Sequence, residues 1–214
     1  MAKSGTVVVP SEKAGEKPLE LLYGEFPPYT LTFTLRGLRP FLFNALLEYA
    51  EEDPGEQKQP RKPPKDYEQM VWRNDAGELA LPVSHVLASI AHAGRYFKSP
   101  IAVRGSAKTT LQEAMVPADE FATFGVKKWD AIDFQIARYA GKSRAPKPTW
   151  RPRLEKGWTL SGSFSVITPE LYSPSRMLEL MAHAGRVCGV GDGRKIGFGR
   201  YATDGTEVTE GITW

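Results

Sequence analysis

The sequence has very little cysteine and no long apolar run. Cys188 is the only cysteine among 214 residues, so the chain cannot close an internal disulfide and lacks the paired thiols of a tetrahedral zinc site. No apolar segment reaches the roughly 20 residues that cross a bilayer. Residues 1–5 do not lead into an apolar core of signal-peptide length. We therefore expect a soluble, cytoplasmic protein without membrane contact.

Histidine is scarce as well, and familiar catalytic motifs are missing. The three histidines are His85, His92 and His183, and none forms the i,i+4 pair of a zinc helix. There is no Gly-x-Ser-x-Gly elbow for a serine nucleophile. We expect no metal and no cofactor, and the histidines leave one catalytic hypothesis open: general acid–base cleavage of RNA by His85 or His92.

Glycine and positive charge are concentrated near the end of the chain. Residues 185–201 hold six glycines and four cationic side chains, which predicts unusual backbone angles beside an anionic ligand. A nucleotide-binding loop follows a strand and opens a helix. Here a predicted helix precedes the glycines and a predicted strand follows them, so ATP or NAD is not the expected ligand.

The hydrophobic periodicity predicts an α+β fold. Residues 29–35 and 158–167 alternate like strands, and residues 83–97 and 175–187 have helical spacing. With strands within residues 104–155 and at 198–203, the order is that of a ferredoxin-like (RRM-like) β-α-β-β-α-β core. It carries a long insertion after the first strand and a hairpin or loop extension.

The composition of the chain indicates an arm, one domain and a tail. We expect an N-terminal arm at 1–28, a single domain at 29–203 and a C-terminal tail at 204–214. Within the domain, residues 51–66 are rich in proline and charge and predict a mobile insertion. Residues 104–155 predict a basic hairpin or loop region.

Basic residues interleave with aromatic ones, a pattern that suits unpaired nucleic acid, because cations neutralise phosphates and aromatic rings stack on bases. The candidate cations are Arg36, Arg39, Arg138, Lys142, Arg144, Lys147, Arg151, Arg153, Arg194, Lys195 and Arg200.

The glycine-rich segment resembles the C-terminal motif of the RAMP superfamily, the RNA-binding proteins of CRISPR effector complexes. Gly191, Gly197 and Gly199 fit the motif. Residues 35–42, 81–90 and 184–192 are similar to the small CRISPR backbone-subunit-like proteins that phages and prophages encode. The resemblance covers roughly residues 29–48 and 80–203.

The resemblance implies subunits that stack along a guide RNA. Phosphate contacts would come from the turn after the first strand, from the first helix, which adds His85 to the candidates, and from the glycine-rich loop. The implied partners are single-stranded guide RNA, complementary DNA, copies of the same chain and other effector subunits. Two alternatives stay open: a phage single-strand DNA binding or annealing protein, and a guide-processing endoribonuclease.

Overall fold

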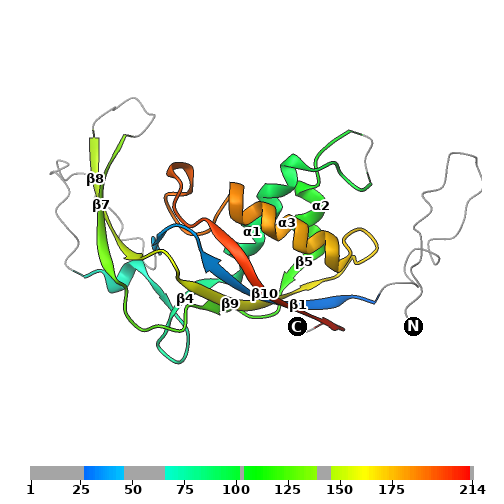
Figure 1. The fold of residues 1–214 in the computed structure, drawn as a ribbon, viewed down its shortest axis with the longest axis horizontal. Helices are drawn as coiled ribbons and strands as arrows, with labels where there is room; N and C mark the ends of the chain where they lie inside the picture. Colours follow the sequence, from blue (N-terminus) through cyan, green and yellow to red (C-terminus); the bar gives the residue numbers. More distant parts are fainter. Residues whose placement is uncertain (1–26, 46–65, 102–103, 139–145, 213–214) are drawn as a thin grey trace, which may run out of the picture.

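The computed structural model describes residues 27–45, 66–101, 104–138 and 146–212. Figure 1 shows one twisted sheet with the helices on one face and a two-stranded hairpin standing at one end. Its elements are β1 (Tyr29–Gly37), β2 (Phe41–Leu42), η2 (Glu68–Met70), β3 (Trp72–Arg73), β4 (Leu79–Pro82), α1 (Val83–Ala93), η3 (Gly94–Tyr96), α2 (Lys108–Ala114), β5 (Met115–Pro117), β6 (Phe121–Thr123), β7 (Ala131–Arg138), β8 (Pro146–Leu154), β9 (Thr159–Val166), α3 (Pro174–Val187), η4 (Arg194–Ile196) and β10 (Tyr201–Glu210).

The centre of the molecule is a ferredoxin-like core. The main sheet has the order β10-β1-β9-β6-β4-β3, with β5 also paired to β9, and these pairings are antiparallel. Strands β1, β5, β9 and β10 with helices α1 and α3 reproduce the predicted β-α-β-β-α-β order. The expected fold class is confirmed.

Side chains alternate between the two faces of each strand, and those on the helix-facing side of the sheet form the core. Leu31, Phe33 and Leu35 of β1 are buried, as the period-two pattern predicts. At Gly162 of β9, an added Cβ would lie 2.8 Å from the Cβ of Ala122, so only glycine allows β9 and β6 to pack this closely. At the start of α3, Ser173 caps the helix by accepting a hydrogen bond from the backbone N–H of Arg176.

The helix-free face of β1 and β9 carries hydroxyl groups. Thr30 and Ser165 share a hydrogen bond of 3.0 Å between their side-chain oxygens, as do Thr34 and Ser161. Thr32 and Ser163 stand opposite each other between these pairs. This part of the sheet offers no aromatic ring on which a base could stack, so RNA recognition of the RRM type does not fit it.

Two of the predicted boundaries were wrong. Strand β10 continues to Glu210 in register with β1, so residues 204–210 belong to the sheet rather than to a tail. Residues 104–155 hold more than a hairpin, because α2, β5 and β6 precede β7 and β8.

Two further predictions fall largely outside the described residues, which lack 1–26 and 46–65: the N-terminal arm at 1–28 and the mobile insertion at 51–66. In the described ranges, no helix combines the length and apolarity needed to cross a membrane.

Candidate nucleic-acid interface

The glycine-rich loop between α3 and β10 has a conformation that only glycine adopts easily. Gly189, Gly191, Gly193, Gly197 and Gly199 all have positive φ, between 66° and 98°. An added Cβ at Gly199 would clash with a backbone carbonyl oxygen, and one at Gly191 would lie 2.8 Å from another. The spacing that marked the motif in the sequence is therefore a backbone requirement.

Backbone hydrogen bonds hold the loop against the segment that follows β1. The N–H of Asp192 donates to the carbonyl of Leu42 at 3.0 Å, and the N–H of Gly199 donates to the carbonyl of Pro40 at 2.8 Å. The loop therefore has a fixed position, and its short 3₁₀ turn η4 projects outward beside the sheet (Figure 1).

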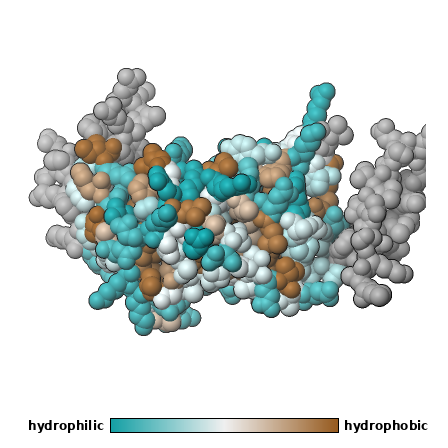
Figure 2. Space-filling model, in the orientation of Figure 1, coloured by the Kyte–Doolittle hydropathy of each residue, from teal (hydrophilic) through white to brown (hydrophobic). Residues whose placement is uncertain are grey.

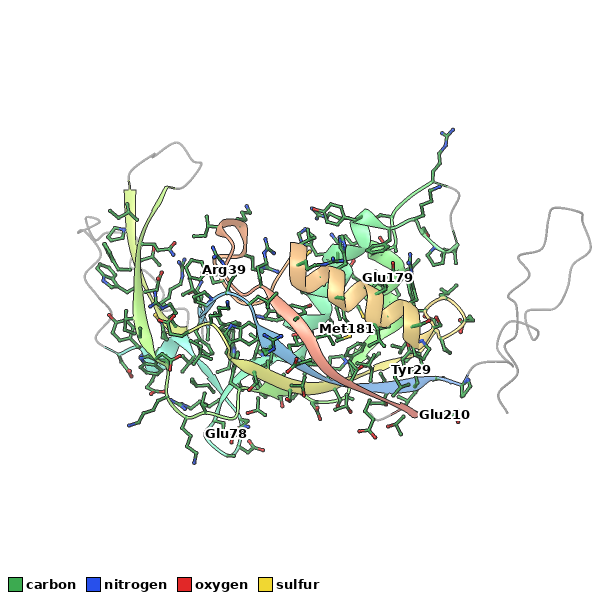
Figure 3. The ribbon with its side chains drawn as sticks, in the orientation of Figure 1. Tyr29, Arg39, Glu78, Glu179, Met181 and Glu210 are labelled. Carbon is green, nitrogen blue, oxygen red and sulfur yellow. The ribbon has the colours of Figure 1, made fainter. Side chains whose placement is uncertain are left out.

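The turn presents cations that form no ion pair with an acidic group of the described residues. Arg194 and Lys195 are exposed, and Arg39 from the turn after β1 brings its guanidinium to the same place, 3.9 Å from the position that a Cβ on Gly197 would take. Figure 3 shows Arg39 just below this loop, and Figure 2 shows hydrophilic side chains on this part of the surface with hydrophobic ones among them. In the described part of the chain, no carboxylate forms an ion pair with Arg39, Arg194, Lys195 or Arg200.

Arg200 adds a buried donor to the same group of cations. Its Nη2 donates to the carbonyl of Arg194 at 3.3 Å. Its Nη1 is buried and has no hydrogen-bond partner among the described residues. A buried, charged donor without a protein partner is costly, and the guanidinium adds positive charge beside Arg194.

The exposed face of α1 lies in the positive field of these side chains. Partial burial, followed by the charge of Arg194, lowers the pKa of His85. The pKa of His92 is lowered first by burial and then by Arg95, Arg194 and Lys108. Cations from several elements therefore act on the same helix, and this arrangement attracts an anion. We name Arg39, Arg194, Lys195 and Arg200 the cation cluster.

An open pocket lies beside the cation cluster. It has a volume of about 320 Å³. Trp72 of β3 and His85 of α1 form its aromatic wall, with ring centroids 5.1 Å apart and planes at 81°. The full lining is Asn44, Trp72, His85, Ala88, Gly191, Asp192 and Arg194.

The hairpin of β7 and β8 is attached to the loop by an ion pair. The Nε of Arg151 lies 2.7 Å from a carboxylate oxygen of Asp192. Arg153 pairs with Asp133 at 3.2 Å and also with Glu155. Arg151 and Arg153, both expected to bind nucleic acid, therefore already have acidic partners, and the Arg151 pair connects the hairpin to the loop.

The remaining predicted residues lie apart from the cation cluster. Arg36 points to the helix-free face of the sheet, where it pairs with Asp204 at 3.3 Å. Arg138 and Lys147 belong to the backbone ladder at the far end of the hairpin. Lys142 and Arg144 lie outside the described residues. The structure thus brings together Arg39, His85, Arg194, Lys195 and Arg200.

Sequence reasoning missed Asn44 and Trp72 as lining residues, and Arg95 and Lys108 as sources of the positive field. Trp72 lies on a strand of two residues, which is too short to show a period. No local signal places Asn44 and Trp72 beside the glycine-rich loop, which lies more than a hundred residues later in the chain.

His183 and the candidate acid–base histidines lie in different places. The ring of His183 packs on Phe97, with centroids 5.1 Å apart, away from the residues that line the pocket. His92 does not line the pocket either. Among the described residues, no group of three or more His, Cys, Asp or Glu side chains is arranged to hold a metal ion.

Comparison with known proteins shows a likeness of fold. No protein-family model matches this sequence, and no curated protein is similar enough to match it. A chain in the structure of the type III-B Cmr-beta complex bound to cognate target RNA is similar to it, with a TM-score of 0.55, 10% identity and coverage of 86% of this chain and 61% of that chain. Cmr6 from Pyrococcus furiosus has a TM-score of 0.48, 11% identity and coverage of 81% and 97%.

This chain therefore spans about 61% of the length of the Cmr-beta chain that it resembles. At 10% identity the likeness concerns the arrangement of the backbone, and it agrees with the strand order and helix placement described above. The protein has an α+β, ferredoxin-like fold, similar to that of the chain in the Cmr-beta structure.

Proposed function

We propose that this protein binds single-stranded RNA as a subunit of a CRISPR-type effector complex, with the RNA backbone passing over the cation cluster. The observation that carries the proposal is the set of cations that lack acidic partners in the described part of the chain, beside a loop with a rigid backbone. Such cations cost folding energy through mutual repulsion and are stabilised when phosphates arrive.

The likeness of fold to a chain in an RNA-bound Cmr-beta complex supports this proposal. The glycine motif, with its RAMP-like spacing, supports the finer part of it. In its finer form, we propose that the chain is a small CRISPR backbone-subunit-like protein of the type that phages and prophages encode. Copies of it would line a guide RNA, and that RNA would pair with complementary nucleic acid. The proposed role is binding rather than catalysis.

The test of this function is binding of unstructured single-stranded RNA at low salt, measured by fluorescence anisotropy against a duplex of the same sequence. We expect tight binding of the single strand that weakens steeply as salt is added. Absence of binding at low salt would refute the proposal. Sequencing the nucleic acid that copurifies from cells tests the finer part, because a uniform guide-length RNA separates a guide complex from a phage recombination protein.

Self-association is a further part of the proposal, and the hairpin supports it. Phe134 and Ile136 are 53% and 61% exposed on one face of β7, and Trp150 of β8 lies beside Phe134 with ring centroids 5.1 Å apart. An exposed apolar face of this kind commonly marks an interaction surface, and a second copy of the chain on the same strand is the partner that we propose. Light scattering with and without RNA should show multimers, and Phe134→Ser with Ile136→Ser should reduce them while binding of one copy persists.

A further inference from the structure

We infer that the pocket lined by Trp72, His85 and Asn44 takes one unpaired base of the bound strand, so that the protein holds bases as well as phosphates. The inference rests on the proposed function, since it names what the same surface does with the strand. Nothing in the fold alone requires this pocket, because it is formed by β3, α1 and the loops around them rather than by the central sheet.

The aromatic wall has the geometry of a base-binding corner. The rings of Trp72 and His85 meet at 81°, so a flat ligand that stacks on the face of one ring turns its own edge toward the face of the other. Stacking of a base on an aromatic side chain accepts any base, because each base has a π-face. The volume of about 320 Å³ lies at the lower end of the range for small-molecule sites, which fits a single nucleotide unit.

The polar lining is complementary to a nucleotide. The side-chain amide of Asn44 carries both donors and an acceptor, and no described residue forms a hydrogen bond with it. Arg194 lies on the rim and belongs to the cation cluster, so a phosphate next to the inserted base would meet it directly. Base edge and phosphate are thus recognised by neighbouring residues.

The one acidic group in the lining does not oppose this ligand. Asp192 is paired with Arg151 at 2.7 Å, and its other oxygen accepts a hydrogen bond from the N–H of Gly193 at 2.6 Å. The carboxylate is therefore compensated within the protein and is not available as a metal ligand. Because the pKa of His85 lies below its ordinary value, the imidazole is neutral at pH 7 and suits contact with an uncharged base.

The experiment compares the affinity of the protein for two strands of equal length and charge, one with bases and one abasic throughout. Phosphate contacts are the same in both strands, so the ratio of affinities measures base contacts alone and is independent of register. We expect the wild type to prefer the strand with bases by about 5- to 140-fold, the range for one stacked base. Trp72→Ala, His85→Ala and Asn44→Ala should each reduce this ratio.

His92→Ala is the matched control, because His92 lies two turns further along α1 and does not line the pocket. It should keep the wild-type ratio. Trp72 also packs against the core, so the thermal stability of Trp72→Ala is measured as well. His85→Ala at an exposed position and Asn44→Ala at a half-buried one carry the test if Trp72→Ala does not fold.

The possible outcomes separate the inference from the proposed function. Equal binding of both strands by the wild type, or an unchanged ratio in His85→Ala and Asn44→Ala, would overturn the base pocket and leave strand binding intact. Absence of binding to either strand would overturn both. A further experiment adds free nucleoside monophosphate. Competition with the strand that depends on the same three residues supports a base in the pocket. Binding that does not affect the strand would assign the pocket to a free nucleotide instead.

Discussion

Removing the charges of the cation cluster should change how strongly RNA binding depends on salt. The variant combines Arg39→Ala, Arg194→Ala and Lys195→Ala. All three side chains are exposed and lack an acidic partner in the described part of the chain. Each substitution should therefore alter the free energy of unfolding by no more than about 0.5 kcal/mol.

The magnitude follows from counterion release. Each phosphate contact on a single strand contributes about 0.7 to the slope of log K against log salt. If each of the three side chains neutralises one phosphate, the slope of the variant is shallower by about 2. Over a fourfold rise in salt, the wild type should then lose roughly twentyfold more affinity than the variant.

Anisotropy titrations with unstructured single-stranded RNA at several salt concentrations measure both slopes. The control variant removes three exposed lysines that lie outside the cation cluster: Lys127→Ala, Lys128→Ala and Lys156→Ala. It has the same net charge as the first variant and should keep most of the wild-type slope. Equal slopes for the wild type and the cluster variant would refute the reasoning, as would an equal reduction in both variants, because the effect would then come from net charge alone.

Three further predictions concern the loop, the hairpin and pH. Gly199→Ala should lower the free energy of unfolding by more than about 2 kcal/mol, since it adds a steric clash to a positive φ. Gly205→Ala should change it little in the same denaturant titration, because its φ is not in the left-handed region and the added Cβ would make only an ordinary contact with Thr34, at 3.9 Å. Arg151→Ala should lower the free energy of unfolding by about 1–3 kcal/mol, because it leaves the partly buried Asp192 unpaired. Amide hydrogen exchange should become faster in β7 and β8, and unchanged exchange would show that the ion pair does not anchor the hairpin. The folded-state pKa of His85 is below the ordinary value of 6.5, so its contribution to stability is complete above that pH and is lost as pH falls toward the lower folded value. His85→Gln should therefore lose less stability than the wild type between pH 7 and pH 5. Equal losses would contradict the lowered pKa of His85.

The hairpin shows why sequence periodicity alone was insufficient. Strand β8 contains Pro146, Pro148 and Pro152, and prolines usually argue against a strand. All three occupy alternate positions, so their nitrogens face the same edge. The carbonyl of Pro152 accepts a hydrogen bond from the N–H of Phe43, which shows that this edge points away from β7. The missing N–H groups therefore do not interrupt the ladder between β7 and β8.

Strand β10 was cut short in the prediction for a related reason. Residues 204–210 are exposed, so no apolar alternation marks them in the sequence. They are a strand because the whole length of β1 offers a partner, from Tyr29 opposite Glu210 to Gly37 opposite Tyr201. Pairing between distant segments, rather than local propensity, determines this edge of the sheet.

The core and the glycine-rich loop could be predicted from the amino-acid sequence, because both depend on local rules. Alternation placed Leu31, Phe33 and Leu35 inside, and the glycines at 191, 197 and 199 specified a backbone that other residues strain. Which cations are available for a ligand depends on the contacts that the folded chain makes. Arg36, Arg151 and Arg153 look identical to Arg39 and Arg194 in a sequence, but the fold brings carboxylates to the first three and not, within the described residues, to the other two. The aromatic corner of Trp72 and His85 likewise exists only because β3 and α1 meet beside the glycine-rich loop.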